Sequence, residues 1–130
     1  MGDELVDRFA PSVVRASAGT GKTFVLTSRY LSLLFTGETP DRILATTFTR
    51  KAAGEIWLRV IERLASALRS DTALRELAEQ LKIELSVERV RYVLRDLLAA
   101  QHRIRICTLD AFCVQIATCF GLELGLAPQW

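Results

Sequence analysis

The hydrophobic positions of the chain follow two different periods. A short apolar run, Ser12–Ala16, ends in a glycine-containing turn, and from Thr23 onward apolar side chains recur at helical spacing. After the turn-forming residues Gly37–Asp41, the run Arg42–Phe48 is typical of a second strand, and Arg103–Leu109 alternates like a third. The pattern predicts strands at these three runs and a helix after the first turn.

Three amphipathic segments separate the second and third predicted strands. They begin after Thr49, Ser70 and Ser86, whose hydroxyls can accept hydrogen bonds from the free N–H groups at a helix start. The first helix is expected to bury Ala52, Ala53, Ile56, Val60, Ile61, Leu64 and Leu68, and the third Val87, Val90, Val93, Leu94, Leu97 and Leu98. A last helix is predicted over Ala111–Phe120, with Asp110 as its candidate N-cap.

The order of predicted elements is β-α-β-α-α-α-β-α. Parallel strands need crossover connections, so this order predicts an α/β fold with a parallel sheet and flanking helices. The 130 residues are about the length of one domain. We interpret residues 1–130 as a single, partial domain, in which the helices at about 70–102 form an insertion at the rim of the sheet.

The composition indicates a globular protein but does not identify what the protein binds. With 50% hydrophobic and 25% charged residues the chain is typical of a globular protein, and its net charge of +2 does not by itself identify a nucleic-acid binder. No apolar run approaches the roughly 20 residues that span a bilayer, which predicts a soluble, cytoplasmic protein without a membrane partner. Cys107, Cys113 and Cys119 are interpreted as small packing residues in a reduced compartment.

A phosphate-binding motif follows the first predicted strand. Residues 16–23, ASAGTGKT, match G-x-x-x-x-G-K-[ST] except that Ala16 replaces the first glycine. Small residues let backbone N–H groups turn toward phosphate oxygens, and the helix that follows points its positive end at them. The expected nucleotide-binding residues are Ala16, Ser17, Ala18, Gly19, Thr20, Gly21, Lys22 and Thr23. An ordinary glycine-rich turn is the alternative interpretation.

Lys22 and Thr23 are the predicted catalytic residues of this motif. The Lys22 ammonium would reach the β- and γ-phosphates, and the Thr23 hydroxyl would ligate Mg²⁺. P-loop hydrolases also need an acidic pair after a second apolar strand. Asp3 and Glu4 precede the loop, and Asp110 is followed by Ala111 rather than by a glutamate. The chain alone is therefore not predicted to be a competent hydrolase.

Three segments, taken together, resemble motifs I, Ia and Ib of the UvrD/RecB-like superfamily 1 DNA helicases. They are Ala16–Thr23, Leu44–Ile56 and Ile106–Cys113, in the family's order. Motif I of that family commonly begins with alanine, and the third segment, with Asp110, is similar to the RecB/AddA helicase-nuclease branch. The resemblance covers most of residues 12–125. It implies the N-terminal part of motor subdomain 1A, an incomplete RecA-like P-loop fold, in a fragment of a larger helicase.

The resemblance also implies cofactors, partners and DNA contacts. ATP and Mg²⁺ would be the cofactors, and the full-length enzyme would move 3′ to 5′ on single-stranded DNA in repair or recombination. Its further partners would be a second RecA-like domain and a helicase-nuclease partner subunit. The DNA contacts would be Thr47, Phe48, Thr49, Arg50, Thr108, Asp110 and Phe112. In the alternative interpretation of the second segment, Phe48 is a core residue and the threonines are strand formers plus a helix cap.

Two other functions stay open at this point. One is a small P-loop phosphotransferase whose helical insertion closes Arg89, Arg91 and Arg95 over the phosphates. The other is a degenerate module that only binds nucleotide. Binding of single-stranded DNA discriminates between them and the helicase fragment. The next strand expected of the family would lie within the sheet, so this chain is predicted to expose an apolar edge and to self-associate.

Overall fold

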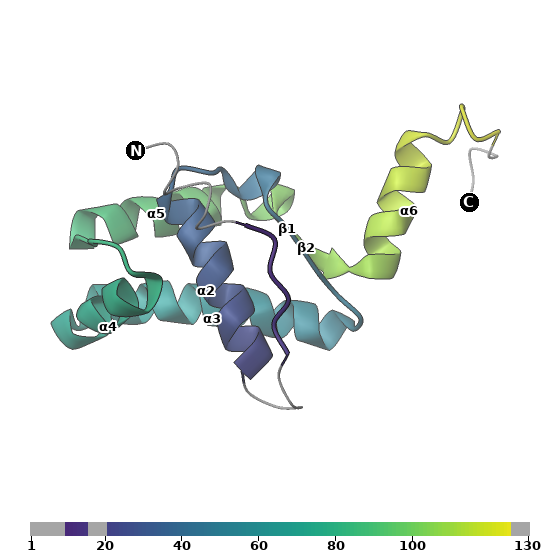
Figure 1. Cartoon of the computed structure of the whole chain (residues 1–130). Coiled ribbons are helices and arrows are strands. Elements are labelled where there is room, and N and C mark those ends of the chain that lie inside the picture. Colours follow the sequence, from purple (N-terminus) through teal and green to yellow (C-terminus); the bar gives the residue numbers. More distant parts are fainter. Residues whose placement is uncertain (1–9, 16–20, 126–130) are drawn as a thin grey trace.

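The computed structural model describes residues 10–15 and 21–125 of the chain. Within these ranges five α-helices, two short 3-10 helices and two strands form an α/β arrangement (Figure 1). In chain order they are α2 (Gly21–Phe35), η1 (Pro40–Arg42), β1 (Leu44–Thr47), α3 (Arg50–Arg69), α4 (Asp71–Leu81), α5 (Val87–Ala99), η2 (Gln101–Arg103), β2 (Arg105–Thr108) and α6 (Leu109–Cys119). The predicted α/β class is confirmed for these residues.

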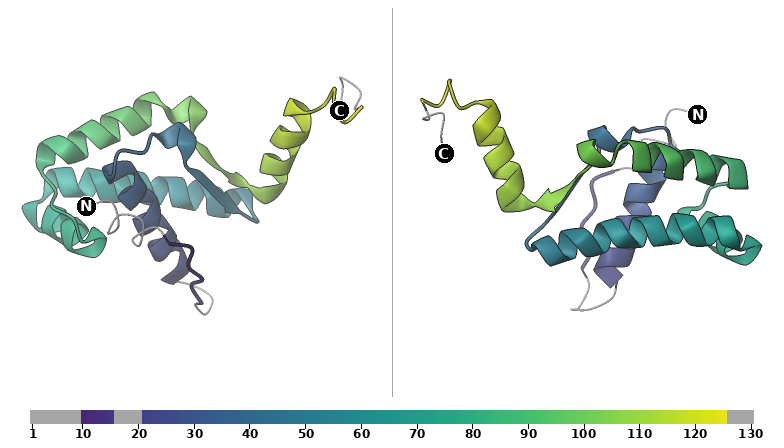
Figure 2. Two further views of the ribbon diagram at one scale, coloured as in Figure 1. Left: turned by 45° about the horizontal axis from the view of Figure 1, so that its top comes forward. Right: turned by 180° about the vertical axis from the view of Figure 1, so that it is seen from behind.

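The two strands form a parallel pair, as predicted. Leu44 lies opposite Arg105 and Thr47 lies opposite Thr108, and α3, α4 and α5 make the crossover between them. Figure 2 shows these three helices arranged against one another beside the sheet. Both strands are shorter than the predicted runs, because 3-10 turns at Pro40–Arg42 and Gln101–Arg103 occupy the residues before them.

The strand predicted at Ser12–Ala16 is wrong for its described residues, 12–15. These residues form no strand, and the Val13 side chain is 89% exposed. The segment lies along α2 (Figure 1), where the Arg29 guanidinium donates hydrogen bonds to Ser12 Oγ and to the Ala10 carbonyl, both at 2.8 Å. The only sheet in the described part pairs β1 with β2, and residues 12–15 are not among its paired residues.

The hydrophobic core lies where α2, α3, α4 and α5 meet one side of the sheet. Leu31 of α2, Leu64 of α3 and Leu97 of α5 are completely buried. The predicted helical stripes are confirmed by the buried residues Ala53, Ile56, Val60 and Leu64 in α3 and Val90, Val93 and Leu97 in α5. The prediction is wrong for Leu98, whose side chain is 46% exposed because it lies at the margin of the α5 stripe.

Hydroxyl side chains begin four of the helices. Thr49, Ser70 and Ser86 each accept a hydrogen bond from the backbone N–H three residues later, which confirms the predicted caps. The start of the last helix differs from the prediction. Thr108 Oγ1 accepts from the Ala111 N–H at 3.1 Å, so α6 begins at Leu109 and Asp110 lies in its first turn instead of capping it.

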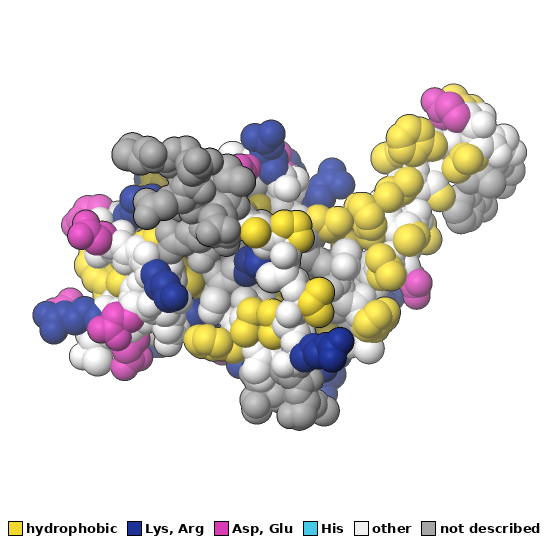
Figure 3. Space-filling view, in the orientation of Figure 1, with side chains coloured by type: hydrophobic (Ala, Val, Ile, Leu, Met, Phe, Trp, Pro, Cys, Tyr) yellow, Lys and Arg dark blue, Asp and Glu magenta, His cyan; other side chains and the backbone are white. Residues whose placement is uncertain are grey.

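Helix α6 extends away from the rest of the molecule (Figures 1 and 2). None of its side chains is buried, although its sequence is largely apolar. Hydrophobic side chains cover this projecting part in Figure 3. The packing prediction is therefore wrong for Cys113 and Cys119, which are exposed, while Cys107 in β2 is half-buried. In the described ranges, no helix is both long and apolar enough to cross a membrane.

The buried phenol of Tyr30 generates a stability prediction. Its hydroxyl has no hydrogen-bond partner in the described part of the chain, and burial raises its pKa to about 12. Tyr30→Phe removes this unsatisfied group and keeps the ring, so we predict an unchanged free energy of unfolding or a gain of up to about 1 kcal/mol in urea denaturation. Tyr92→Phe, at a 64% exposed position, is the control. A clear loss of stability in Tyr30→Phe alone would contradict the prediction.

The exposed apolar surface of α6 predicts that the isolated chain self-associates. We expect sedimentation velocity to show species larger than a monomer that increase with protein concentration. The double variant Ile116→Glu/Phe120→Glu changes side chains that are 43% and 54% exposed, and it should shift the distribution toward monomer without loss of helicity. A monomeric profile of the unchanged chain at high concentration would disprove self-association.

Candidate nucleotide and nucleic-acid site

The phosphate-binding motif leads directly into α2. The helix begins at Gly21, so Gly21, Lys22 and Thr23 form its first turn, where backbone N–H groups have no partner within the helix. Gly21 and Lys22 are exposed and Thr23 is half-buried. This turn carries the positive end of the helix dipole. Ala16, Ser17, Ala18, Gly19 and Thr20 lie outside the described residues, and their part in nucleotide binding stays a prediction.

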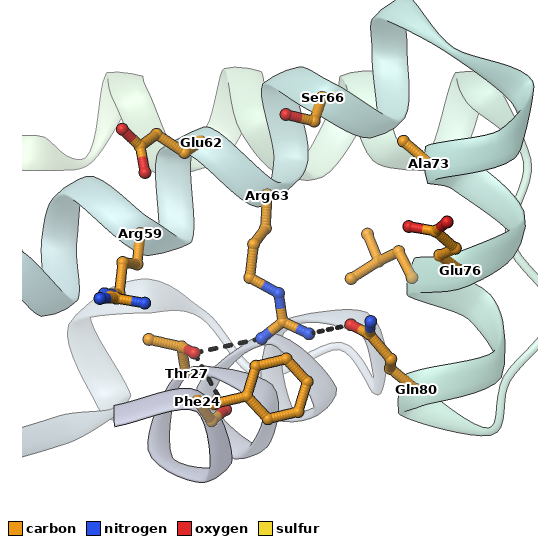
Figure 4. A pocket seen from close by; sticks show the side chains of 10 residues that line it. Phe24, Thr27, Arg59, Glu62, Arg63, Ser66, Ala73, Glu76 and Gln80 are labelled. Atoms are coloured by element: carbon orange, nitrogen blue, oxygen red, sulfur yellow. Dashed lines mark hydrogen bonds between the residues drawn. The ribbon is translucent and has the colours of Figure 1, made fainter. Parts of the chain in front are cut away.

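Arg63 of α3 holds the start of α2 in place (Figure 4). Its Nη1 donates to Thr27 Oγ1 at 3.1 Å and to Ser28 Oγ at 2.9 Å, and its Nη2 donates to Gln80 Oε1 of α4 at 2.7 Å. The guanidinium also lies 4.8 Å from the centroid of the Phe24 ring. Burial lowers the pKa of Arg63. Helix α2 is thus joined to α3 and α4 one turn beyond Lys22 and Thr23.

Sequence reasoning missed this role of Arg63. The helical period places Arg63 among the polar positions of α3, and nothing in its local sequence indicates that it reaches two other helices. The partners Thr27 and Gln80 are 36 and 17 residues away. Thr27 is a buried polar residue that also donates to the Phe24 carbonyl at 3.0 Å.

The first turns of the five described helices differ in charge. Helices α4, α5 and α6 each carry an acidic residue there, whereas α2 and α3 carry none. Lys22 lies in the first turn of α2, and Arg50 and Lys51 lie in that of α3. A cation at the positive end of a helix is unfavourable by about 0.3–1 kcal/mol. These two helix starts therefore favour an anionic ligand.

The parallel pairing brings the second and third motifs to one edge of the sheet. Thr47 and Thr108 are register partners at the carboxyl ends of β1 and β2, and each strand is followed at once by a helix. Thr47 Oγ1 donates to the Thr49 carbonyl at 2.9 Å. Ligands of parallel sheets bind at this end of the strands, which is where the predicted DNA contacts gather.

The side chains at this edge are largely accessible. Phe48 is 90% exposed, so the interpretation of Phe48 as a core residue is wrong. Arg50 and Asp110 are exposed as well, and Phe112 is half-buried. The alternative for the threonines of the second segment holds in part, since Thr49 caps α3, while Thr108 caps α6 in place of the predicted Asp110. Both hydroxyls accept one hydrogen bond there and keep their own O–H available for a ligand.

The described residues supply one group suited to Mg²⁺ in the phosphate-binding motif. The Thr23 hydroxyl lies in the first turn of α2, and Mg²⁺ prefers such oxygen ligands together with phosphate oxygens and water. No group of three or more His, Cys, Asp or Glu side chains gathers within the described ranges to hold a metal. Thr23 therefore fits a metal that arrives with the nucleotide.

Arg89 does not lie where a phosphate-closing lid requires it. Its guanidinium donates to the Phe35 carbonyl, at the carboxyl end of α2. The 15 residues of α2 make a helix about 22 Å long, so Arg89 is at the opposite end from Lys22. This arrangement counts against a phosphotransferase whose inserted helices close over the nucleotide.

Comparison with known proteins shows the family of the chain. The family described as "UvrD/REP helicase N-terminal domain" matches residues 7–130. The chain belongs to this helicase family. It is 36% identical over 121 residues to an ATP-dependent helicase/nuclease subunit of Streptococcus mutans serotype c (strain ATCC 700610 / UA159), covering 91% of this chain and 9% of that protein. The protein of the same name from Streptococcus suis (strain 98HAH33) is 36% identical over 118 residues, with 91% and 8% covered.

The match to this helicase family agrees with the motifs and with the parallel sheet. The two Streptococcus relatives are much longer than this chain. The chain spans less than a tenth of the length of the two Streptococcus proteins. No solved structure is significantly similar to it.

Proposed function

We propose that the chain is the ATP-binding N-terminal part of motor subdomain 1A of an ATP-dependent DNA helicase. The observation that carries this proposal is the charge of two helix starts: α2 and α3 place Lys22, Arg50 and Lys51 at positive helix ends, where an anionic ligand relieves the repulsion. One start belongs to the nucleotide motif and the other to the DNA-contact motif. A helicase needs both anions, the triphosphate and the DNA backbone.

At the nucleotide, Lys22 and Thr23 have separate roles. The Lys22 ammonium binds the β- and γ-phosphates, and the Thr23 hydroxyl is a ligand of Mg²⁺. The N–H groups of the first α2 turn and residues 16–20 surround the phosphates. Arg63, through Thr27 and Ser28, keeps this turn oriented relative to α3. Mg²⁺ supplies charge neutralisation between the phosphates when it is bound.

At the sheet edge, single-stranded DNA is the proposed partner. Arg50 and the hydroxyls of Thr47, Thr49 and Thr108 contact phosphates, and the exposed ring of Phe48 offers a face on which a base stacks. The Asp110 carboxylate accepts hydrogen bonds from base donors, and Phe112 borders the same surface. Because α3 begins at this edge and also carries Arg63, one rigid helix connects the DNA contacts to the nucleotide helix.

The complete enzyme is proposed to need more than this chain. ATP hydrolysis requires a second RecA-like domain that closes on the nucleotide, and the RecA-like sheet of this domain needs further strands. Translocation 3′ to 5′ along single-stranded DNA, in DNA repair or recombination in the cytoplasm, belongs to that enzyme. The Streptococcus relatives are named as one subunit of a helicase/nuclease, which also supports the presence of a second, partner subunit.

Lys22→Ala tests the nucleotide site. The substitution removes the side-chain cation of the motif, so we expect the dissociation constant of a fluorescent ATP analogue with Mg²⁺ to rise at least tenfold. Arg91→Ala, which removes an exposed cation from α5, should leave the affinity unchanged. Equal affinities of Lys22→Ala and the unchanged chain would overturn the nucleotide assignment.

Arg50→Glu distinguishes a loss of DNA binding from a loss of stability, because we expect the variant to bind DNA more weakly but to be more stable. An acidic residue in the first turn of α3 should raise the free energy of unfolding by about 0.3–1 kcal/mol, as measured by urea denaturation. The same change should weaken binding of a labelled oligo-dT at least fivefold in fluorescence anisotropy at low salt. Arg91→Glu changes the net charge equally on α5 and should have a much smaller effect on DNA. Similar losses in both variants would show that binding depends on net charge only.

A further inference from the structure

A groove of about 710 Å³ opens between α3 and β2, and none of the described residues of the nucleotide motif lines it. One of its ends is bordered by Arg50 and Thr108, at the proposed DNA edge, and the other by Gln101 and His102 of η2. Apolar walls between these ends come from Trp57 of α3, from Ile106 of β2 and from Ile104 just before that strand. The groove is continuous with the edge of the sheet, and its size is that of a site for a small ligand.

Gly54 is one of the residues that line this groove, and no local structural feature requires a glycine at this position. It lies within α3, where glycine is less favourable than alanine by about 0.5–1 kcal/mol. Its φ is not in the left-handed region, and a Cβ built on it meets no atom of the described chain within 4 Å. Neither backbone conformation nor close packing requires glycine here. The effect of the missing side chain is to keep space free between Arg50 and Trp57.

The chemistry of the lining fits a nucleotide better than a peptide. It combines the Arg50 guanidinium, the imidazole of His102 and the amide of Gln101 with the indole of Trp57. No carboxylate is among the described residues that line it. A cation at the mouth suits a phosphate, and an aromatic wall with polar groups at the far end suits a base that stacks and forms hydrogen bonds. A peptide strand added to β2 would use backbone groups and would not need the cation.

We propose that this groove receives one nucleotide of the bound single strand, with its base against Trp57 and its phosphate at Arg50. The proposal rests on the proposed function, because it takes the strand from the sheet edge where Phe48 and Thr108 lie. It adds a base pocket to contacts that otherwise involve only the edge. Trp57, a half-buried packing residue beside the core, then has an exposed side with a second role.

The fluorescence of Trp57 tests entry of the base directly. In a Trp130→Phe background Trp57 is the remaining tryptophan of the chain. Titration with oligo-dT should quench its emission with the same dissociation constant that anisotropy of the labelled strand gives. A strand of equal length with abasic sites should bind with little quenching. Equal quenching by the abasic strand, or binding without any quenching by oligo-dT, would overturn the base pocket while the DNA edge stands.

Gly54→Leu and Gly54→Ala form a matched pair for the same question. Leucine extends into the groove from a Cβ position that has free space, whereas alanine adds only the Cβ. We expect Gly54→Leu to weaken oligo-dT binding at least threefold and to remove the quenching, and Gly54→Ala to preserve both. Unchanged DNA affinity and quenching in a folded Gly54→Leu would overturn the proposal. Absence of DNA binding in the unchanged chain would instead disprove the proposed DNA edge itself.

Discussion

The parallel pairing of β1 with β2 is the constraint on which the proposed DNA edge depends. Parallel neighbours require a crossover, and here α3, α4 and α5 make it. The pairing brings the carboxyl ends of both strands, and the starts of α3 and α6, to one edge. Two sequence motifs that are about sixty residues apart along the chain become adjacent for this reason, with Thr47 opposite Thr108.

The nucleotide helix packs on this frame through the hydrophobic core, and polar side chains add further contacts. Arg63 reaches from α3 to Thr27 and Ser28, while Arg29 holds the segment that precedes the phosphate motif along the same helix. Charged donors to neutral acceptors give hydrogen bonds stronger than those between neutral groups. Orientation of the first α2 turn therefore depends on two arginines, and it is coupled through Gln80 to α4.

Several features of the chain are unfavourable for its isolated stability and are located at proposed interfaces. Arg50 and Lys51 oppose the dipole of α3, and Gly54 lowers the helix propensity of the same helix. Phe48 exposes an aromatic ring, and α6 exposes an apolar surface that nothing in the described chain covers. Exceptions to local rules are expected where a protein binds something, because ligand contacts then provide the missing stabilisation.

The sequence by itself determined the features that act over a few residues. The caps at Thr49, Ser70 and Ser86 depend on a hydroxyl and an N–H three residues later, and the buried stripes of α3 and α5 depend on helical period, so both could be predicted. The phosphate motif and the family resemblance also depend on contiguous residues. The family match agrees with the resemblance.

Tertiary structure alone decided which of these elements have neighbours. Residues 12–15 have the composition of a strand but join no sheet in the described chain, and the apolar α6 buries none of its side chains. The exposure of Phe48, the bonds of Arg63 and the groove beside Gly54 likewise depend on residues far away in the chain. The period of apolar positions along the sequence predicts which face of a helix or strand is apolar. Only the folded chain determines what covers it.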